Sequence, residues 1–278
     1  PPFARERAGF KYQPARRKLP CAKPTIQNQF TEFRIMANIE VKPLNYQAGD
    51  TSMHGHIAYD ADAGPRPGIL VVHEWWGLTE YLQRRARMLA EIGYTALAVD
   101  MYGGGKTAAN PDEAGALMNG VLGDMDLANE RIQAAYDALA NDPHTDSSRM
   151  GSIGYCFGGA VSLHAARLGM DLRGVVSFHG SLGKTHEATQ GSIKARILVC
   201  HGAADVLVPE DQVAGFKAEM ESTGADYEFI AYPGALHGFA NPEATGKGEK
   251  YGLPLAYNEE VDLKSWEDMR RFLSEVMA

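Results

Sequence analysis

The sequence predicts an α/β fold built on one mostly parallel central sheet with helices on both faces. From residue 38 on, short apolar runs alternate with stretches in which apolar residues recur every three or four positions. Most of the short runs are apolar at consecutive positions, which is typical of strands that are covered on both faces. Strands that alternate with helices indicate a doubly wound sheet.

The strands open with an antiparallel pair. Ile39–Leu44 and Met53–Tyr59 flank the turn residues Gly49 and Asp50. Six further strands are expected, and their apolar runs favour burial on both faces. They are Gly68–His73, Tyr94–Val99, Arg149–Tyr155, Gly174–Phe178, Ala195–Cys200 and Tyr227–Tyr232.

Five helices are expected between and after these strands. In Tyr81–Ile92, for example, Leu82, Ala86 and Leu89 recur at steps of three and four residues. Because neither an internal repeat nor an interdomain linker is found, residues 38–278 are interpreted as a single domain. The other predicted helices are Asp126–Ala140, Ala160–Leu168, Glu210–Ser222 and Glu260–Val276.

Residues 1–37 differ from the rest in charge. The whole chain has a formal net charge of −8, yet this stretch is rich in lysine and arginine, so the remainder is strongly acidic. An acidic body argues against nucleic acid or an anionic membrane as a partner. We expect residues 1–37 to be a basic extension that is disordered or non-native, with Met36 as a candidate start. An organellar presequence is the alternative, and Pro14 and Pro20 disfavour it.

The location expected for the protein is the cytoplasm. No apolar run approaches the ~18–20 residues needed to span a bilayer, and no apolar secretory segment lies near the start. Three cysteines are too few for a disulfide scaffold, which favours a reducing compartment.

Residues 154–159 carry the strongest chemical motif. They read G-Y-C-F-G-G, between a predicted strand and a predicted helix. This context is typical of a nucleophile elbow, a sharp turn that lifts the nucleophile, here Cys156, clear of the sheet. A helix beginning right after the cysteine would favour its thiolate. The alternative is a buried structural cysteine, the role expected of Cys200 inside its apolar strand; Cys21 is expected to have no role.

Candidates for the acid and the base follow in the order nucleophile, acid, histidine. Asp205 follows the strand Ala195–Cys200, and His237 follows Tyr227–Tyr232. Both come just after strand carboxyl ends, where open α/β sheets place their chemistry. Asp205 would orient the imidazole, and His237 would carry protons. The alternatives are a helix-capping aspartate and a solvated loop histidine.

An oxyanion hole is expected from two backbone N–H groups, those of Phe157 and Trp75, which come directly after the nucleophile and after the strand Gly68–His73. The remaining histidines are interpreted mainly as scaffold. His54 and His56 share one face of a strand but lack further ligands, so no metal site is expected. His73 is expected to satisfy a local hydrogen bond, while His179 and His201 end strands and are candidates to line the pocket.

At this point the sequence resembles the dienelactone hydrolase (carboxymethylenebutenolidase) family of the α/β-hydrolase fold. The resemblance covers residues 38–278. Its marks are HEWWG at 73–77, DMYGGG at 100–105, GYCFGG at 154–159, HGAAD at 201–205 and ALHGF at 235–239. It implies a cofactor-free hydrolase with a Cys-Asp-His triad, and a glutamate, Glu74, that contacts the resting cysteine and controls its ionisation. The alternative for Glu74 is a loop carboxylate bonded to nearby N–H groups.

The chain departs from the family at the substrate carboxylate. Members that hydrolyse dienelactone hold this group with two arginines, and here Asn241 stands at one of these positions. The segment 102–122, where the other is expected, contains Lys106 but no arginine. Without such a clamp an anion loses a charge-assisted contact. We therefore expect neutral, fairly apolar esters, in a pocket for which the candidate lining residues are Trp75, Trp76, Tyr102, His179, Phe239 and Asn241.

The expected activity is cleavage of ester or lactone bonds through a thioester on Cys156, without a metal or other cofactor. A first alternative is a metal-independent phosphotriester hydrolase that uses the same cysteine. Less favoured are a non-catalytic binding protein on this fold and a cysteine-dependent acyltransferase or redox protein. The expected partner is a small-molecule ester, with neither nucleic acid nor membrane, and the sequence leaves monomer and homodimer open.

Overall fold

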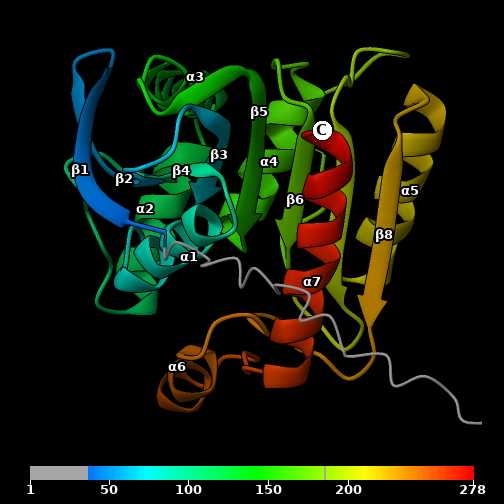
Figure 1. Cartoon of the computed structure of the whole chain (residues 1–278). Helices are drawn as coiled ribbons and strands as arrows, with labels where there is room; N and C mark the ends of the chain where they lie inside the picture. Colours follow the sequence, from blue (N-terminus) through cyan, green and yellow to red (C-terminus); the bar gives the residue numbers. More distant parts are fainter. Residues whose placement is uncertain (1–36, 185) are drawn as a thin grey trace, which may run out of the picture. The chain divides into compact units, whose positions relative to one another are not determined.

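The computed structural model describes residues 37–184 and 186–278, and these contain one eight-stranded sheet. Its strand order is β1-β2-β4-β3-β5-β6-β7-β8 (Figure 1). All eight predicted strands are present, with ends shifted by a few residues. Their bounds are β1 (Ile39–Ala48), β2 (Thr51–Asp60), β3 (Arg66–Val72), β4 (Thr95–Val99), β5 (Thr145–Tyr155), β6 (Gly174–Phe178), β7 (Arg196–Gly202) and β8 (Tyr227–Tyr232).

The expected directions of the strands are confirmed. β1 pairs antiparallel with β2, and β2 pairs antiparallel with β4. All pairs from β4 through β3 and β5 to β8 are parallel. The carboxyl ends of the parallel strands therefore meet at one edge of the sheet, where α/β folds place their ligands.

The helices cover both faces of the sheet. Buried residues of α1 and α7 join one apolar cluster with Ile69 and Val71, and those of α2 to α5 join a second cluster with Leu70 and Val72. Successive residues of β3 thus point to opposite cores, which explains the continuous apolar runs. The helices are α1 (Glu80–Glu91), α2 (Pro111–Leu122), α3 (Met125–Ala140), α4 (Phe157–Arg167), α5 (Glu210–Thr223), α6 (Ala244–Tyr251) and α7 (Glu259–Val276).

Two helices, α2 and α6, were not predicted. The side chain of Asn110 caps α2, accepting the Glu113 N–H at 3.0 Å, and Pro111 occupies the first turn. These start signals stand in the sequence. α6 has only eight residues and contains Gly246 and Gly248, so its local propensity for helix is weak. Figure 1 shows α6 beyond the carboxyl end of β8.

The predicted extension at residues 1–37 lies, apart from Ala37, outside the described residues, as does Cys21. The domain boundary expected there stays a prediction. Among the described residues, no helix combines the length and the apolar character that a bilayer span requires.

Candidate active site

Cys156 occupies a sharp turn between β5 and α4. It has φ 55° and ψ −116° and is the residue before the first residue of α4. Its N–H still continues the sheet, donating to the Phe178 carbonyl at 3.0 Å. A non-glycine residue in this region costs about 1–3 kcal/mol and persists where the surroundings enforce it, most often at functional sites. The half-buried side chain is thus held at a helix N-terminus, which favours an anion.

Glycines make this turn possible. A Cβ on Gly154 would lie 2.0 Å from the Gly158 carbonyl oxygen, and a Cβ on Gly158 would lie 2.2 Å from the Val72 carbonyl oxygen. Both contacts are with backbone atoms, which cannot move aside without a large energetic cost. The elbow therefore depends on α4 packing directly against β5 and β3.

Asp205 and His237 meet at the same edge of the sheet. His237 Nδ1 lies 2.8 Å from Asp205 Oδ2, and both side chains are buried. Asp205 also accepts the Leu207 N–H at 2.8 Å, which fixes the carboxylate. With Nδ1 bonded to the carboxylate, Nε2 is left to face another group.

The pKa of His237 shows which group that is. Burial lowers this pKa, but the charge of Cys156 and the hydrogen bonds to Asp205 and Cys156 outweigh burial and raise it to about 10. The cysteine and the histidine therefore interact, and the arrangement favours a protonated imidazole beside Cys156.

Glu74 lies in the loop after β3 and is paired with Asn241. Asn241 Nδ2 donates to Glu74 Oε2 at 2.5 Å, and both residues are buried. Burial raises the pKa of Glu74, although the Asn241 hydrogen bond and the positive charge of Lys247 oppose the shift. A neutral amide thus faces Glu74, where the family resemblance implied an arginine.

The two amides expected to form the oxyanion hole belong to Phe157 in α4 and Trp75 in the loop after β3. Phe157 is the first residue of α4, where an N–H has no partner within the helix. Within residues 37–184 and 186–278, no backbone carbonyl accepts the Trp75 N–H. The role of both amides as donors to an oxyanion stays a prediction.

The other candidate pocket residues are more buried than a lining role requires. Tyr102 donates its hydroxyl to the Trp75 carbonyl at 3.0 Å and stacks on Phe157. Phe239 and His179 have no exposed surface, and the His179 ring packs edge-on against His237 with centroids 5.2 Å apart. Tyr102, His179 and Phe239 thus pack against residues of the site or its neighbours. A pocket-lining role for them stays a prediction.

The histidines interpreted as scaffold make local contacts. His73 Nδ1 lies 2.6 Å from the Glu74 carbonyl, so it donates there, while its Nε2 accepts the Met101 N–H at 3.1 Å; the local role expected for it is confirmed. His201 packs its ring against Phe229 on β8. Across the described part of the chain, no group of histidine, cysteine or carboxylate side chains has the arrangement of a metal site.

Sequence reasoning missed a buried clamp on the histidine loop. Arg85 donates to the Ala240 carbonyl at 2.7 Å and to the carboxylate of Asp262, and the Tyr81 hydroxyl donates to the same carbonyl at 2.9 Å. Ala240 directly precedes Asn241, so the clamp joins α1 and α7 to the loop that carries the site. The available signal was an arginine at i+4 from Tyr81, on the apolar face of a helix.

Comparisons with known proteins agree with this geometry. Residues 53–277 match the model of the dienelactone hydrolase family. Protein usf of Aquifex pyrophilus is 31% identical over 203 residues, 71% of this chain and 86% of that protein. A protein of Aquifex aeolicus, provisionally named carboxymethylenebutenolidase, is 29% identical over 203 residues, again 71% and 86%.

A solved structure is more similar still. It is a dienelactone hydrolase-like promiscuous phosphotriesterase from metagenomic libraries, 34% identical, with a TM-score of 0.82 over 87% of this chain and 100% of that one. The family model alone spans most of the chain, and the sheet order, the elbow at Cys156 and the His237–Asp205 pair accompany it. The chain therefore belongs to the dienelactone hydrolase family and has the α/β-hydrolase fold.

Proposed function

We propose that this protein cleaves neutral, fairly apolar carboxylic esters and lactones through a thioester on Cys156. The family is one of ester and lactone hydrolases. The observation that carries the finer proposal is the charge coupling between Cys156 and His237, with Asp205 on the far side of the imidazole. A cysteine, a base and an orienting carboxylate in this order are the parts that nucleophilic acyl transfer needs.

In the first half of the reaction, the Cys156 thiolate attacks the ester carbonyl carbon. The resulting oxyanion accepts hydrogen bonds from the Phe157 and Trp75 amides, each typically worth about 3–4 kcal/mol in the transition state. The C–O bond breaks, His237 gives its proton to the leaving alkoxide, and a thioester remains. Glu74, whose pKa burial raises, is near enough for the His237 charge to act on it, so its proton state is linked to that of the Cys156–His237 pair.

In the second half, His237 Nε2 takes a proton from a water molecule as the oxygen attacks the thioester carbonyl. The C–S bond breaks, the acid leaves, and the thiolate returns beside the imidazolium. Asp205 accepts the hydrogen bond from His237 Nδ1 and keeps that proton directed away from the cysteine.

The preference for neutral esters is supported by the environment of Asn241. Its amide is already bonded to Glu74 and supplies no charge. An anionic lactone entering here would face a buried carboxyl without a bidentate cation to offset it.

A substrate panel tests the proposal. Wild type is expected to hydrolyse neutral aryl and alkyl esters with kcat/KM above that for dienelactone, and Cys156→Ala should abolish both reactions. Asn241→Arg, which restores the cation at this position, should shift the preference toward the anionic lactone by about tenfold or more, since a charge-assisted hydrogen bond contributes ~1.5–3 kcal/mol. A strong preference of the wild type for dienelactone would overturn the substrate class.

Phosphotriester hydrolysis is the second candidate, and one observation favours it. The similar solved structure is described as a promiscuous phosphotriesterase. Attack on a neutral phosphotriester also places charge on one non-bridging oxygen, which the same two amides can bind. Chelator-treated protein should turn over an activated phosphotriester, and Cys156→Ala should not. Absence of turnover in the wild type would remove this activity.

A further inference from the structure

The ring of His73 is buried and makes two hydrogen bonds that have no role in the proposed reaction. Its Nδ1 lies 2.6 Å from the Glu74 carbonyl oxygen, and its Nε2 lies 3.1 Å from the Met101 nitrogen. A carbonyl only accepts and a backbone N–H only donates, so Nδ1 carries the proton and Nε2 accepts. Burial lowers the pKa of His73 to about 4, although the Glu74 carbonyl and the charge of Asp100 oppose this shift. The ring is therefore a neutral imidazole held in one tautomer.

The bond from His73 reaches the peptide group that contains the Trp75 N–H. The Glu74 carbonyl and the Trp75 N–H belong to this one group, which is planar, so a bond that fixes the C=O also fixes the direction of the N–H. Donation to the carbonyl polarises the N–H as well and makes it a stronger donor. Gly77 donates its N–H to the same carbonyl at 3.1 Å and closes the turn. His73 thus adds a second restraint to the amide that the proposed oxyanion needs.

The next peptide group along the chain is also held. The Tyr102 hydroxyl donates to the Trp75 carbonyl at 3.0 Å, so the peptide groups on both sides of the Trp75 Cα are bonded to side chains. Tyr102 is itself fixed, because its N–H donates to Asp100 Oδ1 at 2.9 Å. Its ring packs edge-on against His73, with centroids 4.6 Å apart. The Trp75 N–H therefore has little freedom to turn.

Three observations place this loop beside the nucleophile. A Cβ on Gly158, in the first turn of α4, would lie 2.7 Å from the His73 carbonyl oxygen. The His73 ring packs against the Phe157 ring, with centroids 5.8 Å apart. Burial, and then the charge of Cys156, raise the pKa of Tyr102. His73 therefore contacts the residue that supplies one proposed amide and bonds to the peptide group that supplies the other.

We propose that His73 is a positioning residue for oxyanion binding, whose Nδ1–H directs the Trp75 N–H at the oxygen of the reacting carbonyl, with the Tyr102 hydroxyl as a second support. The inference rests on the proposed thioester reaction at Cys156. In this role His73 acts through the backbone and not on the substrate. Its two fixed hydrogen bonds and its neutral state suit that task, because a ring that exchanged protons would not hold one tautomer.

Two amide variants separate the two hydrogen bonds. His73→Asn places an N–H donor near the position of Nδ1, toward the Glu74 carbonyl, whereas the longer His73→Gln places an acceptor near Nε2, toward the Met101 N–H. Each variant loses one buried hydrogen bond, so both should lower Tm by similar amounts. His73→Gln should lower kcat by about 10- to 100-fold and leave KM within about twofold, while His73→Asn keeps kcat within about threefold of wild type. Equal losses of kcat in both variants would overturn the positioning role.

A control variant removes a comparable hydrogen bond elsewhere. Thr95 is buried at the amino end of β4, and its hydroxyl donates to the His144 carbonyl at 2.6 Å. Thr95→Val should lower Tm and leave kcat within about twofold. Alkylation by iodoacetamide is a second control, because Cys156 attacks a CH₂ carbon there and no oxyanion forms. Its rate should stay within about threefold of wild type in both His73 variants, and a large loss would show that the thiol itself is disturbed.

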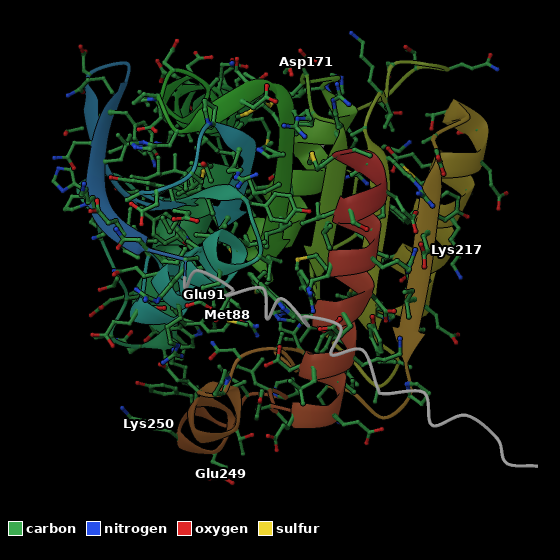
Figure 2. The ribbon with its side chains drawn as sticks, in the orientation of Figure 1. Met88, Glu91, Asp171, Lys217, Glu249 and Lys250 are labelled. Atoms are coloured by element: carbon green, nitrogen blue, oxygen red, sulfur yellow. The ribbon has the colours of Figure 1, made fainter. Side chains whose placement is uncertain are left out.

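The Tyr102 hydroxyl tests the same idea, also where His73→Gln does not fold. Tyr102→Phe keeps the ring and should lower kcat by about 3- to 10-fold. Tyr136→Phe is the matched control, since its hydroxyl donates to the Asp171 carbonyl at 3.2 Å. Figure 2 shows Asp171 at the top of the view, at the opposite end of the molecule from Lys250 on α6. Equal kcat values for the two tyrosine variants would exclude Tyr102 as a support.

An oxyanion mimic separates this inference from the catalytic proposal. The Cys156 sulfur adds to the carbonyl carbon of phenyl trifluoromethyl ketone: a C–S bond forms, the C=O electron pair moves to the oxygen, and no group leaves. Fluorine NMR titration measures the adduct, which should be about 10- to 100-fold weaker in His73→Gln than in wild type or His73→Asn.

The outcomes of this titration are distinct. If the adduct follows the expected pattern but no ester is hydrolysed, the proposed function fails and the positioning role stands. If esters are hydrolysed and the adduct has equal affinity in all three proteins, the positioning role is wrong. If wild type forms no adduct and hydrolyses no ester, both proposals fail.

Discussion

Cys156 and Cys200 lie near the same edge of the sheet, one register position apart, yet their surroundings differ. Tyr155 on β5, Phe178 on β6 and Cys200 on β7 are register partners in sequence across the sheet. Cys200 is fully buried, receives the Tyr232 hydroxyl at 3.6 Å, and has its pKa raised by burial to about 12. Cys156 comes one position later, in a strained turn at a helix N-terminus.

The comparison teaches that one register position at the edge of the sheet separates a core thiol from a candidate nucleophile. Residue type, strand neighbours and nearness to the carboxyl edge are similar for both cysteines. What differs is the backbone, since φ 55° turns Cys156 out of the sheet while Cys200 keeps its side chain in the apolar layer. On β6 and β7, the residues that come directly after the register partners Phe178 and Cys200 are His179 and His201.

The largest expected effect is on activity. Cys156→Ala should reduce ester hydrolysis by at least about 10⁴-fold, because the nucleophile of a covalent mechanism is removed. Cys200→Ala should leave kcat/KM within about threefold, as a core residue outside the chemistry. Steady-state kinetics on both variants checks this. Loss of activity in the Cys200 variant with a normal melting temperature would break the comparison.

The next effect concerns the partner of Cys156. Asp205→Asn should lower kcat by about 10²–10⁴-fold, because the imidazole loses its orienting carboxylate. Asp205 is one of the groups that raise the pKa of His237, so removing its charge lowers that pKa. The alkaline limb of the kcat/KM profile, near pH 10 in the wild type, should therefore move to lower pH. An unchanged limb would exclude His237 as the titrating group.

A third effect separates the two thiols by reactivity. At pH 8, iodoacetamide should alkylate Cys156 in the folded protein at least about 100-fold faster than Cys200, since the pKa of Cys200 is raised to about 12 and its thiolate is scarce. Peptide mapping after timed quenching measures both rates. Rapid modification of Cys200 without unfolding would show that its burial does not protect it.

The smallest effect concerns Glu74. Burial raises its pKa, so the folded state binds the proton more tightly than the unfolded state, and stability falls as pH rises through and above the ordinary glutamate pKa. Glu74→Gln removes this cost while keeping an acceptor for Asn241. The melting temperature of the variant should lie about 2–4 °C above that of wild type at pH 8, which corresponds to ~1 kcal/mol in the free energy of unfolding. The difference should be smaller at pH 4. An equal shift at both pH values would exclude a titrating Glu74.

Much of the site could be predicted because its parts are local. The elbow needs a strand, a run of glycines and a helix within a few residues, and each leaves a pattern in the chain. Asp205 and His237 each lie within a few residues of the end of a strand, β7 and β8, so these parallel strands bring them to one edge. The start of α2 is also visible in the sequence, because Asn110 is a capping residue and Pro111 follows it. A prediction from apolar periodicity alone does not use these two residues.

The remaining features depend on contacts between distant segments. Asn241 and Glu74 are 167 residues apart, and Arg85 and Ala240 are 155 apart. Both separations are too long for a local sequence pattern to predict the pairing. The glycine-containing helix α6 is another such feature, because its local propensity is weak and Trp76 and Ala109 hold it in place.

The sequence by itself therefore determined the sheet, the directions of its strands and the residues that follow their carboxyl ends, because periodicity and turn chemistry act over short distances. Only the tertiary structure decided that a neutral amide faces Glu74 and that a buried arginine clamps the histidine loop. The physical reason is that these features arise where loops of unrelated sequence pack against one another, and such packing depends on the whole fold rather than on any local pattern.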